Sequence, residues 1–310
     1  MLTGIDHIII GVHDLEEAAR HWGTQLGLPV SGGGRHPTGG TANRIIVIGD
    51  TYLELITVHV PGEAQQSMLD RLALGEGYLN FALASDAIEA DSAAMRTRGV
   101  SIMGPAAGQL RSAGGRERGW SRTNVERPDL TQRYPFLIQH DSAGEERRSR
   151  LAGWRTPPEL PLGATAVLSL TLAVNDLHEA TRRLHHIYGL EPSPSFTSEP
   201  DGWEAVLVAF PLGNGGQSIE LAAPLPIPSD LTATNNALLP EPGALTWYLE
   251  RFGEGLCRMT LGVRDLTLAR SYLDEHKVSY IYRDEPQASL WIHPQDSNGA
   301  AIVLHEHQDG

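Results

Sequence analysis

The stretch GIDHIIIGVHDL, residues 4–15, recurs in recognisable form three more times along the chain. Each copy is a short apolar run that leads to an Asp able to open a helix, which indicates a strand entering a helix. One strand position, eight residues before the Leu or Ile that follows this Asp, differs in every copy; we call it the slot, and it holds His7, Asn80, Ser169 and Arg258. Because a strand side chain can change without altering the backbone pattern, we expect function to depend on what fills the slot.

The four copies form two related pairs. Residues 5–28 align without a gap with residues 167–190, and the GEG at 75–77 recurs at 253–255. A single unit, with one small sheet and one helix, buries too little apolar surface to be stable by itself. We therefore expect each pair to close into one strongly curved, mostly antiparallel sheet with helices outside, an α+β fold.

The length and the composition shift between the pairs predict two domains. A chain of 310 residues suits about two domains of roughly 100 to 200 residues each. Between the pairs the sequence becomes charged and then proline-rich, which is typical of a linker. We predict a first domain over residues 1–145, a linker over 146–163 and a second domain over 164–310.

Charge and cysteine content exclude several kinds of partner. With 38 acidic against 24 basic residues the net charge is −14, which argues against nucleic acid or an anionic membrane surface. Two basic clusters, at 111–127 and 145–150, are interpreted as solvated loops. No apolar run approaches the roughly 18 residues of a membrane span. The single cysteine, Cys257, is predicted to be a core thiol and suits a reducing, cytoplasmic location.

A histidine and a carboxylate are predicted to meet inside the first curved sheet. His7 shares a strand face with Ile9, and in TYLELITV, residues 51–58, Glu54 shares a face with Tyr52. If helices cover the opposite face, His7 and Glu54 point into the concavity. An imidazole nitrogen and a carboxylate from two strands can hold a divalent ion such as zinc, nickel, manganese or iron. The alternative is a hydrogen-bonded core histidine and a buried carboxylate satisfied by a nearby Arg or amide.

The stretches DHIIIGVHDLEEA (6–18), GGRHPTGGTANRIIVIGDTYLELITV (33–58) and RFGEGLCRMTLGVRDL (251–266) resemble the glyoxalase-like branch of the vicinal oxygen chelate superfamily. The resemblance implies four βαβββ units in two pairs, each pair forming a cupped sheet with metal ligands on the first and last strands of each unit. Carried onto this sequence, the first cup offers His7, Glu54, Asn80 and Gln139. The second cup offers Ser169, Glu220, Arg258 and Val303.

This sequence departs from the family pattern at several of these positions. Asn80 and Gln139 are amides, which are weak ligands for such a metal. His140 lies beside Gln139 and would need a bulge to turn inward. The resemblance adds His36, on a Gly-flanked loop, as a substrate or catalytic contact. In the second cup we expect Arg258 to pair with Glu220 in place of a metal.

Three functions follow from the resemblance. The first is isomerase or lyase chemistry on a small oxygenated substrate, with Glu54 or His36 moving a proton and with His7, His36, Tyr52, Asn80, Gln139 and His140 contacting the substrate. The second is a metal-free small-molecule-binding module of the drug-sequestering type. The third, an extradiol-type dioxygenase, is disfavoured because Asn80 breaks its set of two His and one carboxylate. No nucleotide cofactor is expected, and a homodimer is one assembly to test.

Overall fold

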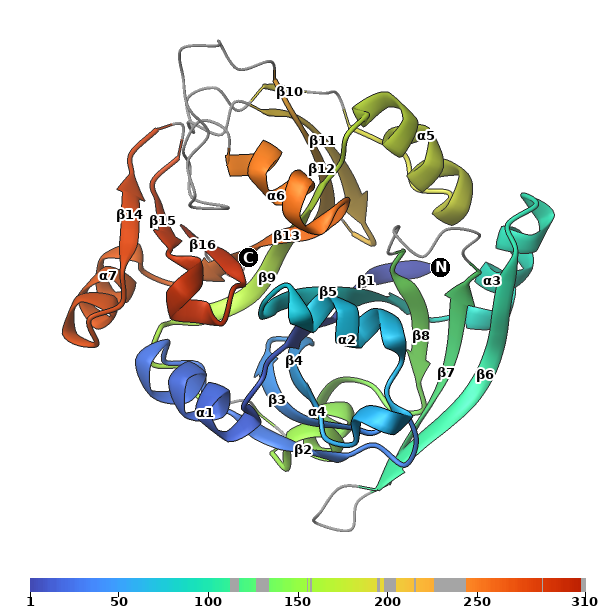
Figure 1. The fold of residues 1–310 in the computed structure, drawn as a ribbon, viewed down its shortest axis with the longest axis horizontal. Coiled ribbons are helices and arrows are strands. Elements are labelled where there is room, and N and C mark those ends of the chain that lie inside the picture. Colours follow the sequence, from blue (N-terminus) through green and yellow to red (C-terminus); the bar gives the residue numbers. More distant parts are fainter. Residues whose placement is uncertain are drawn as a thin grey trace.

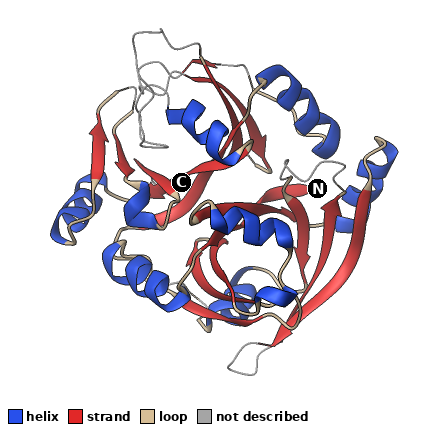
Figure 2. Cartoon of the chain, viewed as in Figure 1, coloured by secondary structure: helices blue, strands red, loops and turns tan. Residues whose placement is uncertain are grey.

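Two curled sheets of eight strands each form the molecule (Figure 1). This computed structural model describes residues 1–111, 117–126, 134–154, 156, 158–193, 196–197, 205–214, 216–225, 244–285 and 287–307. Helices pack around the strands (Figure 2). The predicted α+β fold of four βαβββ units in two pairs is confirmed. Among the described residues no helix is both long and apolar enough to cross a bilayer.

The first sheet has the strand order β2-β3-β4-β1-β5-β8-β7-β6. The first unit comprises β1 (Leu2–Gly11), α1 (Leu15–Arg20), β2 (Ser31–Arg35), β3 (Thr41–Ile48) and β4 (Thr51–Val58). After α2 (Gln66–Ala73), the second unit comprises β5 (Gly77–Ser85), α3 (Ile88–Thr97), β6 (Ile102–Arg111), β7 (Glu117–Val125) and β8 (Phe136–His140). The helix α4 (Gly144–Ala152) follows the second unit.

The second sheet repeats this order as β10-β11-β12-β9-β13-β16-β15-β14. Its first unit comprises β9 (Ala164–Ala173), α5 (Leu177–Tyr188), β10 (Phe196–Thr197), β11 (Ala205–Leu212) and β12 (Gln217–Pro224). After α6 (Ala244–Phe252), its second unit comprises β13 (Gly255–Val263), α7 (Leu266–Glu275), β14 (Tyr280–Arg283), β15 (Ser289–Ile292) and β16 (Ala301–Glu306).

The same strand pairing joins the units of each sheet. The first strand of a unit runs parallel to its last strand, as β1 does to β4. The two units meet where their first strands pair antiparallel, β1 with β5 and β9 with β13. The slot residues therefore lie on the two central strands of each sheet.

A β-bulge precedes the slot in every unit. The β1–β5 ladder shifts register at Asp6 and, on the partner strand, at Leu79. The β9–β13 ladder shifts at Cys257 and at Leu168. A bulge sets two residues against one, so strict alternation of faces fails there. The residue before the slot can then lie on the same face as the slot residue.

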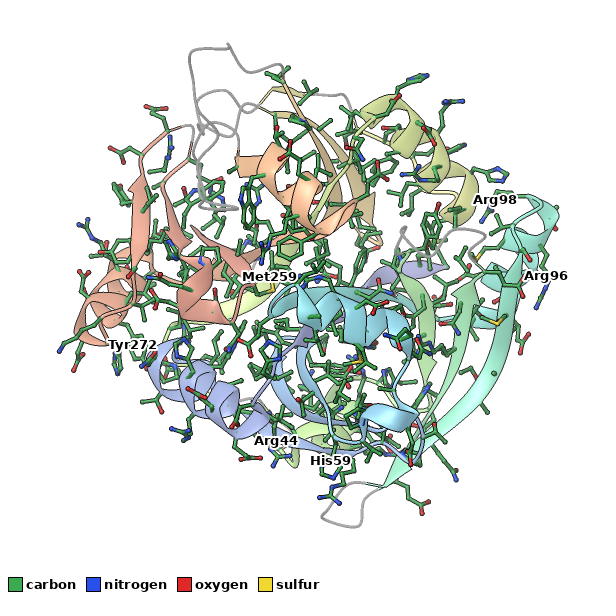
Figure 3. The ribbon with its side chains drawn as sticks, in the orientation of Figure 1. Arg44, His59, Arg96, Arg98, Met259 and Tyr272 are labelled. Atoms are coloured by element: carbon green, nitrogen blue, oxygen red, sulfur yellow. The ribbon has the colours of Figure 1, made fainter. Side chains whose placement is uncertain are left out.

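The two halves share one apolar core, which runs continuously from residues such as Ile8 and Leu53 to Leu170 and Met259. Side chains also bond across the junction. Arg98 donates from the end of α3 to the His186 carbonyl at 2.8 Å, and Tyr272 of α7 donates to the Thr24 carbonyl at 2.7 Å (Figure 3). The division into domains 1–145 and 164–310 remains a prediction, because extensive packing holds the halves together.

The predicted linker begins with the helix α4. The interpretation of residues 145–150 as a solvated loop is wrong, because they form the centre of this helix. Leu151 of α4 packs on Ile45, Val47 and Tyr52 at one end of the first cup. The helix α6 occupies the corresponding concave space of the second cup, where Leu245 and Tyr248 pack with Cys257 and Trp291. In Figure 1, α4 and α6 lie within the curves of their sheets.

Candidate functional site

The concave face of the first sheet encloses a cavity of about 500 Å³. Strands β1, β4, β7 and β8 supply most of its wall, and the loop before β3 and the start of α2 cover its rim. Its titratable and aromatic lining residues are His7, His36, Tyr52, Glu54, Arg118, Trp120, Arg122, Phe136 and His140.

Asp6 and His7 form a buried pair behind this cavity. His7 Nδ1 lies 2.7 Å from Asp6 Oδ1, a contact that the bulge permits between consecutive residues. Burial alone would raise the pKa of Asp6, but the Arg147 charge and the hydrogen bonds from His140 and His7 outweigh it and hold that pKa well below 3.8. Asp6 is thus an acceptor, so we assign the proton to His7 Nδ1. The lone pair of His7 is then on Nε2.

Aromatic rings fix the orientation of His7. Its imidazole stacks on Tyr52 with ring centroids 4.6 Å apart and planes 12° apart. Phe136 meets it edge-on at 5.4 Å. Burial raises the pKa of Tyr52 above its usual value, so its ring packs as a neutral phenol. These contacts hold His7 Nε2 toward Glu54, whose Oε2 is 3.9 Å away.

Glu54 is ionised although it is only 8% exposed. Burial would raise its pKa, but the hydrogen bond from His36, the charges of His7 and His36, and the hydrogen bond from Asn43 together lower the pKa to about 2. Glu54 Oε1 lies 3.4 Å from His36 Nε2 and also accepts from Asn43 Nδ2. The carboxylate therefore stays charged at neutral pH without a metal.

The loop that carries His36 is held in place from both ends. His36 Nδ1 lies 2.7 Å from Thr41 Oγ1, and the His36 amide donates to the Thr41 carbonyl at 2.9 Å. Gly40 has φ +57, and a Cβ there would lie 2.3 Å from the Val60 carbonyl oxygen. Only glycine fits that close approach. His36 is thus a fixed part of the cavity rim.

Asp6 also anchors the far side of the cup. Arg147 Nη2 of α4 donates to Asp6 Oδ2 at 2.7 Å, and His140 Nε2 lies 3.2 Å from Asp6 Oδ1. Burial is the main cause that lowers the pKa of His140, so this imidazole is neutral at pH 7. These groups separate the cup from a wider opening of about 790 Å³ between the halves. Neither His7 nor Glu54 lines that opening, so the smaller cavity is the candidate site.

The structure brings together five of the seven residues predicted for this site: His7, His36, Tyr52, Glu54 and His140. It places the two amides elsewhere. Asn80 Nδ2 donates to the Tyr134 carbonyl at 3.1 Å. Gln139 Oε1 accepts from the Ile88 amide at 2.9 Å, so it caps α3 on the opposite face of β8. His140 faces the cup by simple alternation with Phe136 and Ile138, without the bulge that the sequence analysis required.

Sequence reasoning missed Asp6, Asn43, Arg118 and Arg122. Asp6 was missed because alternation assigns it to the face opposite His7, and only the bulge overrides that assignment. Asn43 lies within the quoted family stretch, but an asparagine on a strand carries no signal of its own. The two arginines lie in a region interpreted as a loop, which instead forms β6 and β7 on either side of residues that the structure does not describe.

The donors of the first cup fit a tightly bound metal poorly. Members of the superfamily often use a divalent metal. Here His7 Nε2 and Glu54 Oε2 are two donors, but Asn43 and His36 occupy Glu54 Oε1, and Asn80 and Gln139 are bonded elsewhere. Within the described ranges no group of three His, Cys, Asp or Glu side chains is arranged to hold an ion.

The second cup contains the predicted pair of Arg258 and Glu220. Arg258 Nη2 lies 3.2 Å from Glu220 Oε2, and Thr171 Oγ1 donates to the same oxygen at 2.6 Å. The Arg258 guanidinium lies 4.9 Å from the Trp291 ring centroid. Cys257 is a buried thiol as predicted, but the bulge places it in the apolar cluster beneath α6. The carboxylate here is neutralised by the chain itself.

Comparison with known families gives one match. The family model described as a glyoxalase-like domain matches residues 5–188, which include the whole first cup and the start of the second. No curated protein matches this chain.

Solved structures also resemble the chain over nearly its whole length. A hypothetical protein from Staphylococcus aureus shares 12% identity at a TM-score of 0.66, with 99% of this chain and 100% of that chain covered. A triple mutant of 4-hydroxymandelate synthase from Streptomyces coelicolor shares 13% identity at a TM-score of 0.63, with 100% of this chain and 95% of that chain covered. At such low identity these likenesses show a common fold.

Proposed function

Because the chain belongs to the glyoxalase-like domain family, we propose that its first cup moves a proton on a small oxygenated substrate, as an isomerase or lyase. The observation that carries this proposal is the arrangement of His7, Glu54 and His36 around one cavity of about 500 Å³. A cavity of that size can enclose a small molecule.

His7 is the group we propose as the base. Its Nδ1 proton is directed to Asp6 at 2.7 Å, which leaves the Nε2 lone pair toward the cavity. When Nε2 accepts a proton, Asp6 and Glu54 both stabilise the imidazolium. An imidazole nitrogen with a free lone pair is the commonest general base in enzymes.

Glu54 supports the reaction through its charge. A carboxylate with a pKa of about 2 is a weak base, so it takes a proton from carbon poorly. Its negative charge instead favours the protonated form of His7 and holds His36. This assignment moves the role of base from Glu54 or His36, as the sequence suggested, to His7.

His36 is proposed to act on the substrate oxygen. Its side chain keeps 23% exposure, and its Nε2 lies beside Glu54 at the cavity rim. In the proposed step a C–H bond next to a carbonyl breaks, the proton passes to His7 Nε2, and the electron pair moves toward the carbonyl oxygen. In this step His36 Nε2–H, which faces Glu54 Oε1 at 3.4 Å in the free protein, turns to the substrate oxygen and stabilises the charge on it. Where the α carbon carries a hydroxyl group, transfer of that hydroxyl proton to the former carbonyl oxygen and return of the abstracted proton to the former carbonyl carbon complete an isomerisation.

Deuterium exchange tests this proposal. The protein is incubated in D₂O with a panel of small carbonyl compounds that carry an α C–H bond, and exchange is followed by NMR. We expect at least one compound to exchange, and His7→Ala to slow that exchange about 100-fold or more. The exposed His13 supplies a matched control, since His13→Ala should leave the rate unchanged.

Two results would overturn the assignment. Exchange that survives His7→Ala would remove His7 from the reaction. Binding of a panel compound in the cup with no exchange in any compound would favour the metal-free binding module instead.

A further inference from the structure

The first cup carries an excess of positive charge in an acidic protein. The chain has a net charge of −14, yet the described lining of the cavity holds Arg118 and Arg122 against the single carboxylate Glu54. Both arginines lie on β7, and alternation along that strand places them on the concave face with Trp120 between them.

Arg118 is buried, and one nitrogen of its guanidinium has no hydrogen-bond partner in the described part of the chain. The residue is 9% exposed, and this nitrogen is Nη1. A buried charged donor that lacks an acceptor costs free energy, so such groups are normally paired. Two other arginines in similar settings are paired: Arg147 with Asp6, and Arg258 with Glu220. Arg118 differs because no carboxylate of the described chain reaches it.

Aromatic rings lie beside Arg118 and Arg122, and a planar ligand group could pack against them. The Arg118 guanidinium lies 6.0 Å from the Trp120 ring centroid. That indole lies against Gly108, where a Cβ would come within 2.6 Å of the ring. Arg122 stacks on Phe136, with its guanidinium carbon 3.7 Å from the ring centroid. The Arg118 Nη1 donor thus lies among aromatic side chains rather than in a purely polar pocket.

From these observations we propose that Arg118, with Arg122, forms a carboxylate-binding subsite for the substrate of this cup. A carboxylate presents two acceptor oxygens in one plane, which suits the planar donor set of a guanidinium. The planar group attached to it packs against Trp120. The substrate class is then a small carbonyl compound with a carboxylate head on a flat body. This inference rests on the proposed function, because it assumes that the first cup is the substrate site.

Binding of benzoate, with benzamide as its neutral counterpart of similar shape, tests the subsite. Titration calorimetry should show benzoate binding to the full-length protein and benzamide binding at least tenfold more weakly. Arg118→Met should weaken benzoate at least tenfold, and Arg20→Met, a change of an exposed arginine, should not. Inorganic phosphate is titrated in parallel. Phosphate binding tighter than benzoate, or equal binding of benzoate and benzamide, would overturn the carboxylate assignment.

Thermal unfolding supplies a second readout. Without ligand, Arg118→Met should raise Tm or leave it unchanged, because a buried guanidinium with an unsatisfied donor is removed. A clear fall in Tm would mean that the guanidinium is structural and would overturn the proposal. His7→Ala should still bind benzoate. If no panel compound exchanges with the unsubstituted protein while benzoate still binds it, the proposed chemistry fails and the carboxylate subsite stands.

Discussion

The two cups of this chain share strand order, bulge and slot, yet their described interiors carry different side chains. In the first, the bulge presents Asp6 behind His7, and Glu54 faces the cavity. In the second, the bulge presents Cys257, while Arg258 neutralises Glu220 and α6 fills the space. The same bulge thus places a carboxylate beside the slot histidine in the first cup and a buried thiol beside the slot arginine in the second.

Truncating a side chain that fills the second cup should cause the largest loss of unfolding free energy. Tyr248 of α6 is 4% exposed and donates to the Leu256 carbonyl at 2.7 Å. Tyr248→Ala should cost about 4 kcal/mol of unfolding free energy, because it opens a cavity and removes a hydrogen bond. Met68 of α2 is half-buried and lines the open first cup, so Met68→Ala should cost less than about 1 kcal/mol. Equal losses in denaturant unfolding would show that the two cups are packed alike.

Breaking the Arg258–Glu220 ion pair of the second cup should cause the next largest loss of unfolding free energy. Arg258→Ala leaves Glu220 unpaired at 18% side-chain exposure, and we expect a loss of about 3 kcal/mol. With Glu220→Gln added, the loss should be smaller than the sum of the two single changes. The surface pair of Arg264 and Glu159 is the control, since Arg264→Ala should cost under about 0.5 kcal/mol. Additivity in the double-mutant cycle would mean that Arg258 and Glu220 do not interact.

Acid should destabilise the first cup through Glu54. Its pKa falls from 4.5 in the unfolded chain to about 2 in the fold, so the ionised form stabilises the fold above pH 4.5. That contribution, roughly 3 kcal/mol, is lost as pH falls through 2. Glu54→Gln should flatten the stability profile between pH 4.5 and 2, whereas Glu16→Gln, at an exposed site, should not. A variant profile parallel to that of the unsubstituted protein would refute the role of this carboxylate.

Adding a divalent metal should change the protein least, because we expect only weak metal occupancy of the first cup. We expect any divalent ion to bind only the first cup, weakly, through His7 and Glu54, because the amides Asn80 and Gln139 are bonded elsewhere. Zinc titration of the metal-free protein should give sub-stoichiometric occupancy that His7→Ala abolishes. One tightly bound ion retained by His7→Ala would place the metal at another site.

The repeat pattern predicted the fold because four copies of one strand-to-helix signal leave few ways to pair the units. The slot likewise pointed to His7, and the alternation of β4 pointed to Glu54 and Tyr52. Alternation failed at Asp6, because a bulge is a tertiary feature of the paired strands and leaves no clear mark in either sequence. Which residues of β8 point into the cup depends on how this strand pairs with its neighbours. The sequence therefore assigned Gln139 to the cup, whereas the structure places His140 there. The two arginines of β7 escaped notice because their Gly- and Arg-rich surroundings favour a loop in the absence of the sheet.

The tautomer of His7 tests the central difference between the cups most directly. Long-range ¹H–¹⁵N correlation of the His7 ring at pH 7 should show a protonated Nδ1 and an unprotonated Nε2. Asp6→Asn should disturb that state, because it removes the carboxylate that holds the Nδ1 proton. A protonated Nε2 in the unsubstituted protein, or a spectrum unaffected by Asp6→Asn, would contradict the account, since His7 would then present no lone pair to the cavity.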